Sequence, residues 1–99
     1  MTGSEHRFEH VSSITQNYKF LLQQLDLEYS NLLDELLARG VIDPREKERV
    51  SSHRTNYDRN GQLLTLLMAK TKDEFVKFLC ALDETEQHHV REPIEHGHR

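Results

Sequence analysis

The chain has 99 residues, a formal net charge of −4 at pH 7 and one cysteine, Cys80. A chain of this length forms one domain with a modest core, and a single cysteine excludes an intrachain disulfide framework. The negative charge argues against nucleic acid as a partner, because phosphate binding needs net or clustered positive charge. No apolar run approaches the ~20 residues that span a bilayer, and the N-terminus lacks the apolar core of a signal peptide. These features favour the cytosol or the nucleus, and we expect a cytoplasmic protein that does not contact membranes.

The N-terminal part of the chain carries apolar residues at the spacing of two amphipathic helices. The first helix is expected over residues 11–25 and the second over residues 28–39, because apolar residues recur there at i, i+3 and i+4. Gly40 follows the second helix and is predicted to end it, since glycine adopts a positive φ without steric cost. Val41 and Ile42 are then expected to fill the corner before the next helix.

A third helix is expected over residues 44–51. Asp43 suits its N-cap position, and Pro44 suits its first turn, where a missing N–H does no harm. A fourth helix is expected over residues 57–69, where a block of leucines provides the apolar face. Short helices joined by tight connections predict a small helical bundle.

The C-terminal part predicts two more helices. Thr71 and Glu74 form a capping box at the start of the fifth helix, because each side chain can accept the other residue's backbone N–H. The fifth helix is apolar around most of its circumference, which is typical of a central, buried helix. A sixth helix is expected over residues 84–91 with Val90 as its main anchor, and Pro93 is expected to end or kink it.

Three stretches resemble the second, fourth and fifth-to-sixth helices of caspase recruitment domains: residues 32–42 (LLDELLARGVI), 63–70 (LLTLLMAK) and 73–90 (DEFVKFLCALDETEQHHV). The similarity covers residues 11–92, and residues 1–10 and 93–99 are interpreted as flexible termini. The resemblance implies an all-α death fold, which is an antiparallel six-helix Greek-key bundle with a first helix that is often bent.

The resemblance also implies a function, which is binding to another caspase recruitment domain or to a second copy of the chain. Members act as adaptors, scaffolds or regulators in apoptotic and inflammatory signalling, and head-to-tail contacts extend such domains into oligomers or filaments. The family's best-known contact pairs an acidic surface of the second and third helices with a basic surface of the first and fourth. The candidates for the acidic face are Asp34, Glu35, Asp43, Glu46 and Glu48. The candidates for the basic face are Lys19, Arg54, Arg59 and Arg7. Gly61 stands where members often carry an arginine, so the basic face lacks that charge.

Two other functions are compatible with the sequence. The bundle can act as a regulatory domain that packs within its own larger protein. A metal-binding domain is a third interpretation, because imidazole is a common zinc ligand and four histidines lie near the C-terminus: His88, His89, His96 and His98. Adjacent helical residues diverge by about 100°, so two neighbouring histidines do not easily share one ion, and we predict no metal or other cofactor. The sequence shows no phosphate-binding loop or nucleophile motif, so we predict no enzymatic activity.

Overall fold

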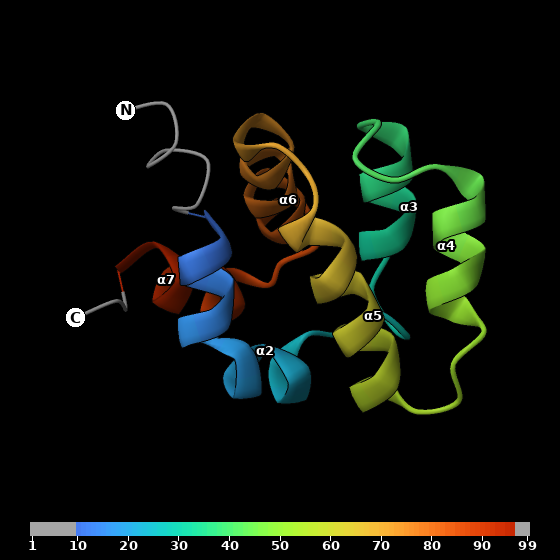
Figure 1. Ribbon diagram of the computed structural model, residues 1–99, viewed down its shortest axis with the longest axis horizontal. Helices are drawn as coiled ribbons and strands as arrows, with labels where there is room; N and C mark the ends of the chain where they lie inside the picture. Colours follow the sequence, from blue (N-terminus) through green and yellow to red (C-terminus); the bar gives the residue numbers. More distant parts are fainter. Residues whose placement is uncertain (1–9, 97–99) are drawn as a thin grey trace.

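The computed structural model describes residues 10–96, which form a bundle of short helices (Figure 1). Residues 10–16 form the first helical segment. The remaining helices are α2 (Tyr18–Gln24), α3 (Leu32–Ala38), α4 (Pro44–Ser51), α5 (Asn56–Met68), α6 (Lys72–Glu84) and α7 (His88–His96). Residues 10–96 contain no strand, which confirms the predicted all-α class. Residues 1–9 and 97–99, which belong to the termini predicted at residues 1–10 and 93–99, lie outside the described residues.

The first predicted helix is present and bent. Its two parts are separated at Asn17, whose backbone N–H donates to the Ile14 carbonyl oxygen at 3.2 Å. The Asn17 side-chain amide also donates to the Ser13 carbonyl oxygen at 2.9 Å. A bond to the third residue back tightens the turn and interrupts the α-helical ladder. Residues 10–24 therefore correspond to the bent first helix that the resemblance implies, and with it the described part contains six helices.

α3 begins at Leu32, four residues later than predicted. The Asp26 carbonyl oxygen accepts a hydrogen bond from the Ser30 hydroxyl, and the Asp26 carboxylate accepts the Tyr29 N–H at 3.0 Å. Such local side-chain bonds compete with the helical ladder. They hold residues 26–31 in a bent connection between α2 and α3.

The corner between α3 and α4 forms as predicted. Gly40 has a φ of +77°, and its N–H donates to the Leu37 carbonyl oxygen at 3.1 Å. The Val41 N–H donates to the Leu36 carbonyl oxygen at 2.9 Å. This pair of bonds is the Schellman motif, which a left-handed residue after the helix permits. Val41 and Ile42 are both buried, which confirms that they fill the corner.

The boundary between the last two helices differs from the prediction. α6 continues to Glu84 and α7 begins only at His88, whereas the sequence predicted one helix over residues 84–91. Glu86 lies between them with a φ of +63° and reverses the chain. A left-handed glutamate has no signal in the sequence, because glycine is the residue that usually marks this conformation.

Pro93 lies inside α7 and does not end it. The proline removes one N–H, which would have donated to the carbonyl of His89, and His89 is exposed, so water can replace this bond. Val90, the predicted anchor, is fully buried, and Ile94 is buried after the proline. α7 therefore includes residues 93–96, which the sequence assigned to the C-terminal tail.

A single hydrophobic core joins the helices. α5 packs against α2 and α4, and α6 packs against α3 and α7.

α6 is buried on one side only, because Val76 is 44% exposed, so the predicted burial around most of its circumference is wrong. His10, which the sequence placed in the N-terminal tail, is helical and buried, with its ring centroid 5.4 Å from that of Phe75. The largest fully buried side chains are Phe78, Ile14, Leu21, Leu32, Leu36, Leu63, Leu64, Leu67, Leu82, Val41, Val50 and Val90.

Candidate interaction surface

The predicted acidic residues lie on α3 and α4, which are neighbours at one end of the bundle (Figure 1). The Asp34 carboxylate lies 2.7 Å from Lys47 Nζ on α4, and the Asp34 side chain is 63% exposed. The Glu35 carboxylate accepts a hydrogen bond from Arg39 Nε at 2.9 Å, one turn further along α3. Exposed ion pairs of this kind contribute only about 0–1 kcal/mol to stability. The Glu35 side chain is 32% exposed, so both carboxylates remain accessible to solvent although each is paired.

Two other acidic residues are bound into the fold. Asp43 caps α4, where its carboxylate accepts the Glu46 N–H at 2.8 Å and the Glu46 carboxylate accepts the Asp43 N–H at 3.0 Å. Glu46 also accepts two hydrogen bonds of 3.0 Å from Lys70 Nζ, just after α5. Glu48 differs from both, because it is exposed and forms no ion pair with another described residue. The acidic face thus contains surface carboxylates and carboxylates that hold α4 in place.

Arg59 on α5 is the most constrained residue of the basic face. Its guanidinium donates to Asn56 Oδ1 at 2.8 Å and to the Arg54 carbonyl oxygen at 3.2 Å. The same guanidinium lies 3.8 Å from Glu28 Oε1, in the connection between α2 and α3. With its side chain only 22% exposed, Arg59 orders the start of α5 and its contact with that connection.

The other basic candidates are more accessible. Lys19 on α2 and Arg54 just before α5 are exposed. Neither side chain forms an ion pair with another described residue. α2 packs against α5, so Lys19 lies on one helix of this pair and Arg54 lies in the connection just before the other. Arg7 lies outside the described residues.

The contact between α2 and α5 depends on two residues that precede the leucines of α5. Asn60 is buried, and its Nδ2 donates to the carbonyl oxygens of Leu22 at 2.8 Å and Leu25 at 3.0 Å. These carbonyls at the end of α2 lack an intrahelical partner. A Cβ atom at Gly61 would lie 3.4 Å from Leu22 Cδ2, so position 61 packs against α2. A side chain at position 61 would therefore point toward α2 and make contact with Leu22.

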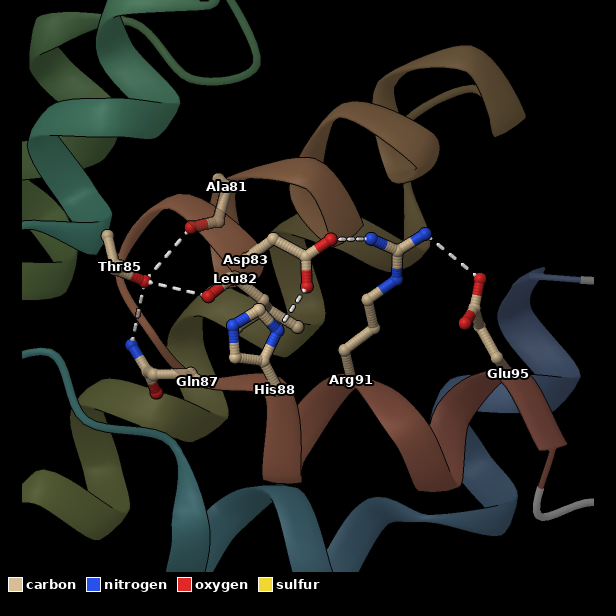
Figure 2. Close-up of polar contacts among 8 residues, drawn as sticks. All are labelled: Ala81, Leu82, Asp83, Thr85, Gln87, His88, Arg91 and Glu95. Carbon is tan, nitrogen blue, oxygen red and sulfur yellow. Dashed lines mark hydrogen bonds and ion pairs between the residues drawn. The ribbon is translucent and has the colours of Figure 1, made fainter.

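The α6–α7 junction holds a polar cluster that the sequence analysis missed (Figure 2). The Asp83 carboxylate pairs with His88 Nδ1 at 2.9 Å and with the Arg91 guanidinium, which also pairs with Glu95 at 3.0 Å. Asp83 is five and eight residues from its two partners, across a helix break, so no helical period reveals these pairs, whereas Arg91 and Glu95 form an i, i+4 pair within α7. His88 thus pairs with a carboxylate and not with its neighbour His89.

Gln87 is a second residue that the sequence analysis missed. It is 3% exposed, and its Oε1 accepts the Asp26 N–H at 3.0 Å. Its Nε2 donates to the Asp26 carbonyl oxygen at 3.1 Å and to the hydroxyl oxygens of Ser30 and Thr85 at 3.2 Å. A lone glutamine between two helices belongs to no periodic pattern. Only the fold brings it to the α2–α3 connection, which it fastens to the α6–α7 junction.

Within residues 10–96, no group of three or more histidine, cysteine or carboxylate side chains is arranged to hold a metal ion. His98, one of the candidates, lies outside this range. None of the helices in the described part is both long and apolar enough to cross a bilayer.

A family model of the caspase recruitment domain matches residues 12–97. The chain belongs to the caspase recruitment domain family. Membership confirms the predicted family and, with the all-helical structure, the death fold. Caspase recruitment domains are modules that bind other caspase recruitment domains, so this domain is of the protein-interaction class.

Two curated relatives are similar to part of this caspase recruitment domain. Apoptotic protease-activating factor 1 of Mus musculus is 30% identical over 57 residues, which cover 58% of the chain and 5% of the relative's own length. The protein of the same name from Rattus norvegicus matches with the same identity and coverage. The aligned region is thus a small part of each of these relatives.

Proposed function

We propose that this caspase recruitment domain binds another caspase recruitment domain, or a second copy of itself, through its acidic and basic faces. We further propose that it acts as an adaptor, scaffold or regulator in apoptotic signalling, which the similarity to two apoptotic protease-activating factors supports. Inflammatory signalling is the other setting that the family resemblance implies. The observation that carries the proposal is the family match over residues 12–97.

The distribution of accessible charge supports the use of two different faces. Asp34 and Glu48 expose carboxylates on α3 and α4, while Lys19 and Arg54 expose cations on α2 and beside α5. Surfaces of opposite sign on different helices suit a head-to-tail contact, in which one copy presents the acidic face and the next the basic face. Asp43 and Glu46 lie at the start of α4, within the acidic face. Their hydrogen bonds hold α4 in the position that the partner contacts.

A charge-swap experiment tests the proposal. We expect the double variant Asp34→Lys/Glu48→Lys to lose self-association, or binding to a purified caspase recruitment domain, because it places cations opposite cations. The variant Lys19→Glu/Arg54→Glu should lose the same binding from the other side. Mixing the two variants should restore association, because each then offers one face that matches the other. Light scattering as a function of protein and salt concentration measures all three states.

The matched control is Glu92→Lys, which reverses an exposed carboxylate on α7, a helix that belongs to neither proposed face. It should associate as the wild type does, and circular dichroism should give all variants the same helical content. Association of wild-type strength in both double variants, with the same salt dependence, would contradict the assignment of the faces.

A regulatory domain that packs inside its own larger protein is the alternative function. It predicts a monomer at every concentration and no binding to purified caspase recruitment domains. A metal-binding domain predicts a rise in melting temperature on titration with zinc. These outcomes separate the three functions without reference to the charge variants.

A further inference from the structure

Tyr29 is the most exposed large side chain with apolar character in the described part of the chain. It is 85% exposed, whereas Tyr57 is 53% exposed in the first turn of α5 and Tyr18 is half-buried on α2. These are the three tyrosines of the sequence. A tyrosine carries a large apolar ring, so its nearly complete exposure on a small domain calls for a role outside the core.

The backbone at Tyr29 is neither helical nor part of a strand. Its N–H is held by the Asp26 carboxylate at 3.0 Å, while its own hydroxyl makes no hydrogen bond to a described residue. The chain is therefore bent so that the phenol extends into solvent. Tyr57 differs, because a helical backbone cannot lie extended in the substrate groove of an enzyme without unwinding.

Two of the three residues before Tyr29 are acidic. Glu28 is its direct neighbour with a side chain that is 47% exposed, and Asp26 lies three residues before it. Carboxylates beside a tyrosine complement a positively charged substrate groove. Asn31, two residues after the tyrosine, is exposed as well, so residues 28–31 form a short stretch around the phenol in which only Ser30 is half-buried.

We propose that Tyr29 is a phosphorylation site for a protein tyrosine kinase. In the transfer, Tyr29 Oη forms a bond to the γ-phosphorus of MgATP, and the bond from that phosphorus to the β–γ bridging oxygen breaks. The phenol proton goes to the catalytic carboxylate of the kinase, and ADP leaves. The domain itself supplies only the acceptor hydroxyl and its surroundings.

The fold limits how far a kinase can grip this segment. Leu27 and Leu32 are buried on either side of the accessible stretch. Gln87 forms hydrogen bonds to Asp26 and Ser30 and tethers the segment to the α6–α7 junction. Loosening this tether should therefore make the segment a better substrate. The structure thus links the rate of phosphorylation at Tyr29 to the hydrogen bonds of a residue 58 positions away in the sequence.

Phosphorylation would change the charge beside the basic face. A phosphotyrosine adds a charge of about −1.5 to −2 at pH 7. Its neighbour Glu28 already lies 3.8 Å from the guanidinium of Arg59. The added charge opposes the attraction of Arg54 and Arg59 for an acidic partner, so phosphorylation should weaken assembly. This consequence rests on the proposed function, whereas the modification site does not.

The test incubates the intact folded chain with MgATP and the catalytic domain of a non-receptor tyrosine kinase that accepts acidic substrates. Mass spectrometry then measures the phosphorylation of each tyrosine over time. We expect Tyr29 to be modified about tenfold faster than Tyr57 or Tyr18. Tyr57 and Tyr18 lie on helices that must unwind before a kinase can bind them, whereas the connection that carries Tyr29 is already non-helical. Tyr29→Phe should abolish most of the incorporation, while Tyr57→Phe should leave it unchanged.

Two further measurements make the outcome decisive. A peptide of residues 22–36 checks that the kinase accepts the sequence itself. If the peptide is modified and the folded chain is not, or if Tyr57 or Tyr18 reacts as fast as Tyr29 in the folded chain, the proposal is overturned. It is equally overturned if the peptide is not modified by any of several such kinases.

The tether is tested with Gln87→Ala, with Gln23→Ala on the exposed side of α2 as its matched control. We expect the first variant to raise the rate at Tyr29 severalfold and to leave the rate at Tyr57 unchanged, which excludes general unfolding as the cause. The stoichiometrically phosphorylated domain is then compared with the unmodified domain by light scattering. Unchanged assembly with full modification would refute the regulatory consequence and leave the modification site standing.

Discussion

Two corners of this caspase recruitment domain use the same backbone device with different residues. At the end of α3, Gly40 is left-handed with a φ of +77°, and at the end of α6, Glu86 is left-handed with a φ of +63°. Both corners close with the same pair of hydrogen bonds. The Glu86 N–H donates to the Asp83 carbonyl oxygen at 3.0 Å, and the Gln87 N–H donates to the Leu82 carbonyl oxygen at 2.7 Å.

The residue after the left-handed position is what distinguishes the corners. Val41 in the first corner is buried and packs against the core, as expected for a Schellman motif. Gln87 in the second corner is equally buried and instead forms hydrogen bonds to the α2–α3 connection. The first corner is therefore stabilised locally and the second through a contact between distant segments. This difference explains why only the first was predictable.

The largest effect is expected for Gln87→Ala. The variant removes the bonds to the backbone of Asp26 and to the hydroxyl of Ser30, and it leaves the partly buried Asp26 N–H without its partner. We expect a loss of about 2–3 kcal/mol in the free energy of unfolding. Urea unfolding measures it, with Gln23→Ala as the control that should change stability by less than about 0.5 kcal/mol. An equal effect of the two substitutions would show that the second corner does not depend on Gln87.

Gly40→Ala is expected to have the next largest effect. A Cβ atom at Gly40 meets nothing within 4 Å, so the cost comes from the left-handed backbone alone and amounts to about 1–2 kcal/mol. Thermal unfolding measures it as a fall of several degrees in melting temperature. Gly61→Ala is the matched control, because its Cβ would make an ordinary contact and alanine favours the helix by about 1 kcal/mol. Equal destabilisation by both glycine substitutions would show that the left-handed backbone at Gly40 is not the source of the cost.

Glu86→Gly should act in the opposite direction and stabilise the domain. It removes the cost of a left-handed residue with a side chain, and the greater freedom of glycine in the unfolded chain offsets part of the gain. We expect a net increase of about 0.5 kcal/mol in the free energy of unfolding. Differential scanning calorimetry can resolve the corresponding rise in melting temperature. A fall would mean that the Glu86 side chain makes a contribution that its exposed position does not suggest.

The smallest effect is expected for Asp83→Asn in the polar cluster of the second corner. The carboxylate pairs with His88 and Arg91, but its side chain is 35% exposed and that of His88 is 71% exposed. Solvent screening reduces such pairs to about 0.5 kcal/mol or less. Urea unfolding at low and high salt should show a small loss that shrinks as salt increases. A large loss independent of salt would identify the cluster as a structural element of the corner.

Much of the fold was predictable because its signals are local. The glycine and proline around the α3–α4 corner, and the capping boxes at Asp43 and Thr71, depend on residues only a few positions apart. The candidate faces were predictable in part. The sequence placed Asp34 and Glu48 on the correct helices, yet it could not separate them from Glu46, whose carboxylate is bound by Lys70, 24 residues away.

The sequence by itself determined the all-α class, the position of most helices, the α3–α4 corner and the family. Helical periodicity, capping residues and glycine act within one or two turns, so they are visible along the chain. The tertiary structure alone decided the late start of α3, the left-handed Glu86 and the burial of Asn60 and Gln87. The burial of Asn60 and Gln87 depends on hydrogen bonds between segments far apart in the sequence, such as that of Gln87 with Asp26 and that of Asn60 with Leu22. The bonds of Gln87 also join the left-handed corner at Glu86 to the connection before α3. Buried polar groups need such partners, and only the folded chain supplies them.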